Sequence, residues 1–282
     1  MRFVVAALLL CGCNQVFGLN PTEALPPTDA QYFDAPPDAP FTCPPAGTLP
    51  QFSPVLHQIQ QNCRFYTRSA DWATAECRDM PTRMAQGAPD GPFASIGGLE
   101  DDFPFTYENP QLAPEGDELF VRYSDPGAAT GEIKVFRRSG NSWTEAGAVS
   151  INGVTITAEV AFGTPSRAPN RRMFVSNYDI SEIREIELDA TYHGTVVATY
   201  TPQEVDTFLR SQPNLTPDGL RIIFSVGGAG RDQVGYGDRA SLADRFTFQL
   251  LPDAPTGETP FLTEDCGRLY FSAASSVLWV QQ

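Results

Sequence analysis

The chain has 282 residues, 41% of them hydrophobic, and a formal net charge of −15 at pH 7. This length allows one or two domains, and a single all-β domain can reach roughly 250 residues. A chain with this much negative charge repels the phosphate backbone of nucleic acids, which excludes sequence-independent binding to them. No apolar run approaches the roughly 20 residues that a membrane-spanning helix needs. The 25 prolines and 23 glycines predict many turns and few long helices.

The N-terminus has the features of an export signal. A basic start precedes the apolar run 3–10, which is too short to span a bilayer but suits a secretory signal. Gly12 and Cys13 resemble the lipobox of bacterial lipoproteins, in which the chain is cut before a cysteine that is then acylated; Cys11 fits this pattern less well. We predict a signal peptide at residues 1–12 and a lipid anchor on Cys13. The alternative is an ordinary signal peptide with two incidental cysteines.

The anchor is followed by a tether. Asn14 follows Cys13. By the sorting rule of enterobacterial lipoproteins, a residue other than aspartate at this position implies transport to the outer membrane. Residues 20–42 contain six prolines and no hydrophobic periodicity. Such segments act as semi-rigid spacers of about 3.1 Å per residue, so this one could reach roughly 70 Å. We therefore predict an exported protein held on the bacterial outer membrane by a tether at residues 13–42, with a PxxP-type binding motif as the alternative use of the prolines.

Four later segments share one pattern. Each begins with a proline, turns four to six residues later and enters a strand of aromatic and aliphatic residues. The starts are spaced by 55, 48 and 47 residues, at Pro110, Pro165, Pro213 and Pro260. The turns contain Glu115-Gly116, Asp218-Gly219 and Asp265-Cys266-Gly267. Their glycines supply the positive φ that a tight turn demands. In the second unit Arg171 replaces the turn glycine and one residue is missing.

This period predicts the fold. Repeats of about 40–50 residues with several short strands indicate the blades of a β-propeller. We predict an all-β fold over residues 43–282: a small propeller of about five blades, with six as the alternative, each a four-stranded antiparallel sheet. Residues 43–105 would form a divergent first blade. The last unit has three strands, and a strand near residues 46–52 would complete it.

One helix is expected outside the sheets. Thr201 to Glu204 form a capping box with a proline at the first helical position. Apolar residues follow at helical spacing, so we predict a short helix over residues 202–211.

The repeat also carries a family resemblance. The pattern P-x-L-[ST]-P-D-G-x-x-[LI]-[IYF]-F, closest in the unit that starts at Pro213, resembles the TolB-like β-propeller repeat of bacterial envelope proteins. The resemblance covers residues 105–282 and implies a propeller fold but no catalytic residue. The lipobox, the tether and the degenerate repeats are also similar to the secreted lipoproteins of myxobacteria.

The cysteines predict disulfides, because an exported protein meets an oxidising compartment. Outside the signal peptide, Cys43, Cys63, Cys77 and Cys266 allow three sets of pairs. A hairpin over residues 63–77 would place Cys63 opposite Cys77 at disulfide distance. Cys43 and Cys266 would then join the start of the domain to its last blade.

No motif for catalysis, metal or cofactor binding is present. The sequence lacks a GxSxG elbow, an HExxH motif, a phosphate-binding loop and a calcium loop. His57 is expected in a strand and His193 in a surface turn, while 100–102 and 227–230 are expected to be loops. The alternative uses, a cation site at Glu100-Asp101-Asp102 and a phosphate loop at 227–230, are less favoured.

The leading hypothesis is therefore a non-catalytic envelope lipoprotein whose propeller presents a binding surface for protein or glycan. One alternative is a hydrolase or lyase, which would need at least two carboxylates that converge at one end of the propeller channel with perturbed pKa values. The other is a structural spacer of an envelope complex.

Overall fold

The computed structural model describes residues 43–48, 50–80, 83–97, 99, 107–124, 131–152, 154–155, 160–177, 183–201, 204, 209–228, 231–251, 256–273 and 275–282. They belong to one compact unit, Phe41–Gln282, and Met1–Pro40 form a separate unit. The predicted signal peptide, the anchor at Cys13 and the tether lie outside the described residues. Within the described residues, no helix has the length and apolar character needed to cross a membrane.

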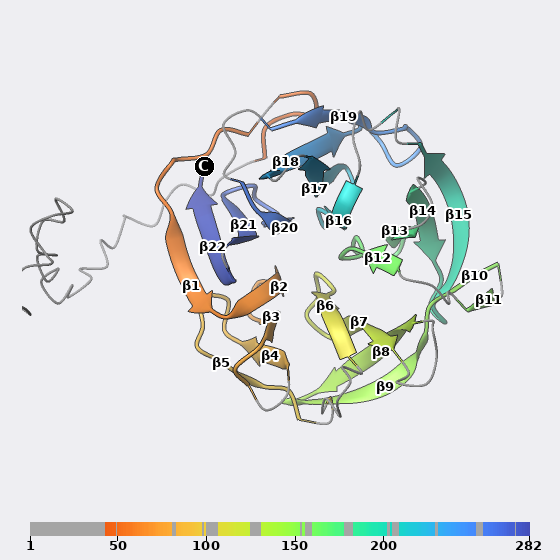
Figure 1. Cartoon of the computed structure of the whole chain (residues 1–282). Coiled ribbons are helices and arrows are strands. Elements are labelled where there is room, and N and C mark those ends of the chain that lie inside the picture. The colour runs from red at the N-terminus through yellow and green to blue at the C-terminus, as the bar shows by residue number, and fades with distance from the viewer. Residues whose placement is uncertain are drawn as a thin grey trace, which may run out of the picture. The chain divides into compact units, whose positions relative to one another are not determined.

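Five sheets surround a central axis (Figure 1). Blade 1 runs outward through β2 (Cys63–Arg68), β3 (Ala73–Cys77), β4 (Met84–Gly87) and β5 (Phe93–Ser95). Blade 2 has β6 (Tyr107–Leu112), β7 (Glu118–Ser124), β8 (Gly131–Ser139) and β9 (Ser142–Ala148). Blade 4 has β16 (Leu209–Leu215), β17 (Arg221–Gly228), β18 (Arg231–Asp238) and β19 (Thr247–Leu250). The chain is a five-bladed β-propeller.

Blade 3 is wider than predicted. Its four antiparallel strands are β12 (Val160–Phe162), β13 (Arg172–Asn177), β14 (Ile183–Leu188) and β15 (His193–Tyr200). The short strand β10 (Ser150–Ile151) adds to β15 in parallel, and β11 (Val154–Thr155) pairs with β10. The connection from blade 2 thus gives its neighbour two outer strands, which makes a six-stranded sheet.

Blade 5 closes the ring by pairing the two ends of the domain. It contains β20 (Glu258–Leu262), β21 (Arg268–Ala273) and β22 (Ser276–Gln281), and its outer strand is β1 (His57–Gln61). β1 runs antiparallel to β22, with His57 opposite Trp279. The prediction that an N-terminal strand completes the last blade is confirmed, but its place near residues 46–52 is wrong. The residues read as an early strand of blade 1 supply it instead.

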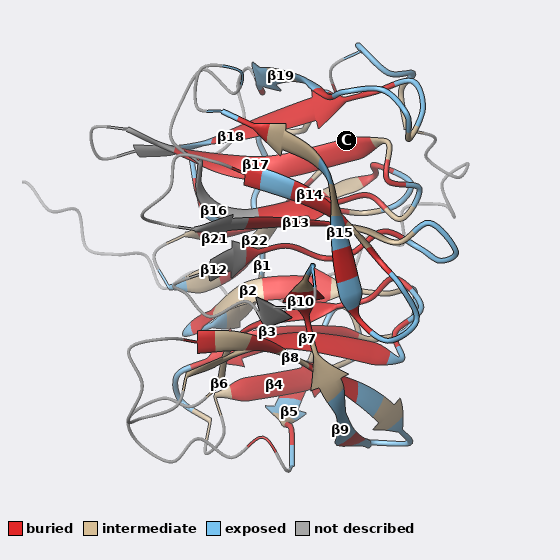
Figure 2. Cartoon of the chain, turned by 90° about the vertical axis from the view of Figure 1, so that its right-hand side faces the viewer, coloured by how far each residue is buried: buried red, intermediate tan, exposed pale blue. Residues whose placement is uncertain are grey.

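The repeated apolar triplets form the core. Leu119, Phe120 and Val121 are fully buried, as the β-propensity and apolar side chains of a central strand require. The second strands of the later blades place their triplets in the same way, and Figure 2 shows buried residues along the middle of the sheets. The predicted core is therefore confirmed.

The predicted helix over residues 202–211 is only partly within the described chain. The Thr201 amide donates to the Glu204 carboxylate at 2.8 Å, which is the expected capping contact. Leu209 onward belongs to β16, so the helix prediction is wrong for residues 209–211. Pairing with β17 outweighs the local helical pattern there.

Candidate functional site

One face of the propeller carries the turns between the first and second strands of all blades, and we call it the turn face. The same backbone hydrogen bond closes each turn, at 2.7–3.0 Å. Its donors are the amides of Ser69, Ala113, Ser166, Thr216 and Thr263, and its acceptors are the carbonyls of Trp72, Glu118, Arg172, Arg221 and Arg268. This bond defines equivalent positions in the five blades.

The equivalence corrects the alignment of the second repeat. Ser166 and Arg172 are six positions apart, whereas Ala113 and Glu118 are five apart. The turn of blade 3 is therefore one residue longer, not shorter. Gly163, and not Pro165, takes the place of Pro110 in the inner strand.

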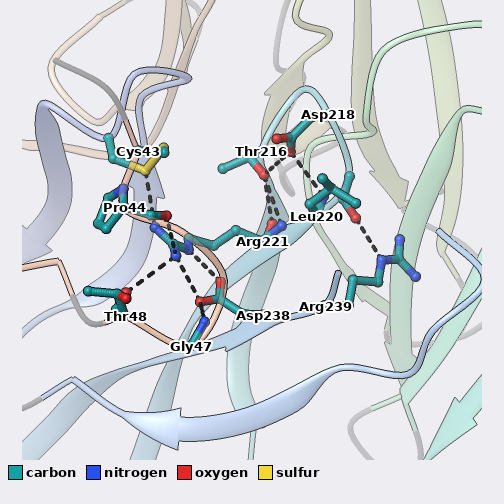
Figure 3. Close-up of polar contacts among 12 residues, drawn as sticks. Cys43, Pro44, Gly47, Thr48, Thr216, Asp218, Leu220, Arg221, Asp238 and Arg239 are labelled. Atoms are coloured by element: carbon teal, nitrogen blue, oxygen red, sulfur yellow. Dashed lines mark hydrogen bonds and ion pairs between the residues drawn. A yellow bond between two sulfur atoms is a disulfide. The ribbon is translucent and has the colours of Figure 1, made fainter. Parts of the chain in front are cut away.

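The predicted turn aspartates hold their own turns. Asp218 accepts hydrogen bonds from the Thr216 hydroxyl at 2.6 Å and the Leu220 amide at 3.0 Å (Figure 3). Asp265 accepts a matching pair from Thr263 and from the amide of Gly267. Such side-chain contacts are what make aspartate favourable in tight turns.

The turn glycines are needed for conformation and for space. Gly116 and Gly219 have φ of 77° and 70°, and a Cβ on Gly116 would lie 2.6 Å from the Ser69 hydroxyl of blade 1. In blade 5 the corresponding left-handed residue is Cys266, with φ of 57°, and not the predicted Gly267. A cysteine thus occupies a glycine position of the repeat.

Charged turn residues meet at the end of the central axis on this face, and we call this place the mouth. Arg167, on the turn of blade 3, makes a bidentate ion pair with Glu264 of blade 5, at 2.8 and 3.1 Å. Its Nε lies 3.7 Å from the Glu115 carboxylate of blade 2. Blades 3 and 5 are not neighbours in the ring, so this contact must cross the end of the axis.

The mouth has an excess of negative charge. Hydrogen bonding to Glu264 raises the pKa of Arg167, and Glu115 and Asp218 add to the effect. The three groups of the contact are all accessible: 47% of the Arg167 side chain, 31% of Glu115 and 58% of Glu264 are exposed. One guanidinium therefore faces the carboxylates of three other blades in a solvated position.

Buried carboxylates elsewhere are neutralised by arginine. Among the described residues, Glu76, Glu118, Glu185 and Asp238 are almost fully buried. Glu118 pairs with Arg171 at 2.6 Å and accepts a hydrogen bond from Tyr192. The other three have arginine nitrogens within 2.5–2.9 Å. None of the four is an unpaired acid or base.

A belt of polar side chains joins the inner strands near the axis. Thr67, Gln111, Thr164 and Asn214 occupy one equivalent position in blades 1 to 4, and all are buried. Thr164 is 3.0 Å from Gln111 and 2.9 Å from Asn214, and Asn214 donates to the Pro260 carbonyl at 2.7 Å. Each polar group finds its partner in a neighbouring blade, so the belt fixes the ring rather than offering a ligand site.

Residues 43–48, which we call the strap, contact blades 4 and 5 on the turn face, and Figure 3 shows Pro44, Gly47 and Thr48 around Arg221. Cys43 is bonded to Cys266, and Cys63 to Cys77, which are the two predicted pairs. Arg221 forms a buried pair with Asp238 and donates to the Pro44 carbonyl at 3.3 Å. Asp238 also accepts the Gly47 amide, so one ion pair holds the strap at two points.

The two histidines are the first residues of their strands: β1 for His57, as predicted, and β15 for His193, at the end of the predicted turn. His57 stacks on Trp279 at 4.1 Å, and His193 is exposed beside Asp189. Glu100-Asp101-Asp102 and residues 229–230 lie outside the described residues. The loop prediction is wrong for residues 227–228, which belong to β17 and pair with β18. No group of three or more metal-binding side chains occurs in the described part of the chain.

The comparisons with known proteins identify no family for this chain. No protein-family model matches the chain, and no curated protein matches it. Solved structures do match. A gluconolactonase from Xanthomonas campestris is 10% identical with a TM-score of 0.46, over 74% of this chain and 68% of that one. TolB from Acinetobacter baumannii is 9% identical with a TM-score of 0.46, over 76% and 52%. The periplasmic gluconolactonase of Pseudomonas aeruginosa is 15% identical with a TM-score of 0.39, over 77% and 61%.

The sequence missed the residue at the centre of the mouth. Arg167 stands in the degraded second unit, and its partners come from turns 52 residues earlier and 97 residues later in the chain. The sequence predicts a purely structural role for the turn acids Glu115 and Asp218, and the structure brings both around Arg167. The position of an arginine in a turn of otherwise acidic repeats is the only signal that could have indicated it.

Proposed function

We propose that this chain is an exported, lipid-anchored binding protein without catalytic activity, whose turn face contacts a partner protein. The two disulfides are consistent with an exported protein. The lipid anchor on Cys13 and the outer-membrane location remain part of the proposal. Fold similarity to proteins named as TolB or gluconolactonase carries no weight here, because function depends on the site and not on the fold.

The observation that carries the proposal is the mouth. There Glu115, Asp218 and Glu264 lie around a single guanidinium, in an exposed position. A net acidic surface of this kind attracts and orients a basic partner. A polypeptide with arginine or lysine side chains suits it better than a neutral glycan does.

We propose that the protein is not a catalyst because its buried carboxylates, among the described residues, are all paired with arginine. General acid–base chemistry needs a carboxylate or histidine that is free to exchange a proton at the substrate. Each of the four buried carboxylates within the described residues has an arginine partner, and the exposed acids of the mouth share Arg167. The hydrolase and lyase alternatives therefore have no candidate pair among these residues.

Binding is tested by capture from membranes of the source bacterium. The immobilised protein should retain a reproducible partner, and the double variant Glu115→Gln, Glu264→Gln should lose it. The control variant is Glu145→Gln, an exposed acid that pairs with Lys134 in blade 2. If the double variant captures as much partner as the wild type, the mouth is not the binding site. Hydrolysis of gluconolactone by the purified protein would refute the proposal that it is non-catalytic.

A further inference from the structure

The ring closes where blade 5 meets blade 1, and we call the contact between them the closing seam. Aromatic side chains from both blades fill it. Tyr66 of blade 1 stacks on Tyr270 of blade 5 at 4.5 Å, and Phe261 meets both rings. Among these apolar groups, two arginines reach the surface of the turn face.

Arg68 departs from the repeat in this place. It precedes the donor of the turn hydrogen bond, and the equivalent positions of the other blades are all apolar and buried. They are Leu112, Pro165, Leu215 and Leu262. Arg68 is only partly buried, so a charged side chain stands where the other blades bury an apolar one, and this substitution calls for a reason beyond packing.

The hydrogen bonds of Arg68 all go to neutral oxygens. Its Nη1 donates to the Tyr270 phenol at 3.1 Å, its Nε to the Ser69 carbonyl and its Nη2 to the Ala70 carbonyl. No described carboxylate lies within ion-pair distance of it. Arg167, Arg171, Arg221 and Arg268 of the turn face each pair with an acid, whereas Arg68 has no ion-pair partner among the described residues.

Arg268 of blade 5 meets Arg68 at the same phenol oxygen. Its Nη1 lies 3.4 Å from the Tyr270 hydroxyl and 3.0 Å from the Asp90 carboxylate. Asp90 is 60% exposed, and it is the only described acid paired with either arginine. Two guanidinium groups thus contact the same Tyr270 oxygen, and the one described carboxylate paired with either of them is the exposed Asp90.

We propose that Arg68 and Arg268 form a carboxylate-binding site at the closing seam. A ligand carboxylate would accept one N–H from each guanidinium beside Tyr270. Asp90, which now pairs with Arg268 alone, would move into solvent. Paired charge-assisted hydrogen bonds of this kind are the strong ones, and arginine is the side chain best shaped for them.

The carboxylate belongs to a polypeptide rather than to a sugar acid. Trp279 lies against Arg268, but the Arg268 guanidinium is stacked on it at 4.3 Å and the His57 ring at 4.1 Å. It offers no open face on which a sugar ring could stack. An aspartate or glutamate side chain, or a C-terminus, needs no such face. That a partner supplies this group rests on the proposed binding function, whereas the carboxylate site itself does not.

The site is tested on the purified protein by NMR of the arginine Nε–H signals. Acetate is titrated against its neutral isostere acetamide, and a short peptide with one glutamate against the same peptide with glutamine. Saturable shifts at Arg68 and Arg268 are expected with acetate and the glutamate peptide only. Glucuronate is the third probe, and binding tighter than that of the peptide would overturn the polypeptide assignment.

Two variants make the result specific. Arg68→Leu restores the residue that the repeat uses, so the protein should stay folded while the affinity for acetate falls at least about tenfold. Arg138→Leu removes another arginine of the turn face without a described acid partner, stacked on Trp72 at 3.7 Å, and should bind like the wild type. Equal shifts with acetamide, or undiminished acetate binding in Arg68→Leu, would overturn the proposal. Neither outcome depends on whether the acidic mouth captures a partner.

Discussion

The left-handed cysteine of blade 5 leads to a sharp prediction about stability. Cys266 has φ of 57° at a position that is glycine in blades 2 and 4. A side chain in this conformation costs about 1–2 kcal/mol. We infer that the disulfide with Cys43 maintains a conformation that the residue would not choose alone.

The disulfide and the left-handed conformation at residue 266 should change the free energy of unfolding by different amounts. Cys43 and Cys266 are 223 positions apart, and closing so long a loop stabilises the folded state by about 5 kcal/mol in the chain-entropy model, as an upper value. Cys43→Ser should lose most of this amount. In the Cys43→Ser background, Cys266→Gly should then be more stable than Cys266→Ala by about 1 kcal/mol, because only the alanine keeps a strained Cβ.

The assay is urea unfolding of the three variants and the wild type, followed by tryptophan fluorescence and far-UV circular dichroism. Equal m-values would show that the same surface unfolds in each variant. The alanine variant is the matched control, since both double variants lack the disulfide and the sulfur. If Cys266→Ala proves as stable as Cys266→Gly, the turn does not require the left-handed conformation and the reasoning is refuted.

Four other predictions follow from the sequence and the structure. Cys13→Ala should move the protein from the membrane to the soluble fraction, and continued membrane association would exclude Cys13 as the anchor. Gly219→Ala should cost about 2 kcal/mol or more in urea unfolding, because its Cβ would lie 2.9 Å from a leucine side chain, whereas Gly140→Ala, with nothing within 4 Å, should cost about 1. Asp238→Asn should destabilise by about 3–5 kcal/mol, since it leaves a buried arginine unpaired; a loss under 1 would contradict this. Burial raises the pKa of Tyr236 to about 12, so the folded state holds its proton more tightly and stability should fall as the pH rises from 10 to 12; Tyr236→Phe should reduce that fall by about 2 kcal/mol.

The sequence predicts the blades well because their signals are local. The turn residues around Gly116 and Gly219 and the apolar triplets lie within a dozen positions of each other, so one unit contains its own evidence. The cysteine pair of blade 1 could be predicted for the same reason, from one short hairpin.

The features that the sequence does not predict depend on distant parts of the chain. β1 has the sequence HQIQQ with a single apolar residue, and nothing in it indicates a partner more than 200 positions away. Cys266 is next to Gly267, so an alignment by residue type selects the glycine, although the backbone places the cysteine at the turn. The environments of Arg167 and Arg68 arise from turns that come together only when the ring closes.

The strap also determines how the domain bears mechanical load. Tension on the chain ahead of Cys43 passes through the disulfide into the turn of blade 5, instead of reaching β1. The hydrogen bonds between β1 and β22 that close the ring are therefore shielded from a force that would peel them apart one by one. With the proposed anchor ahead of Cys43, the propeller would be pulled by its attachment without separating β1 from β22.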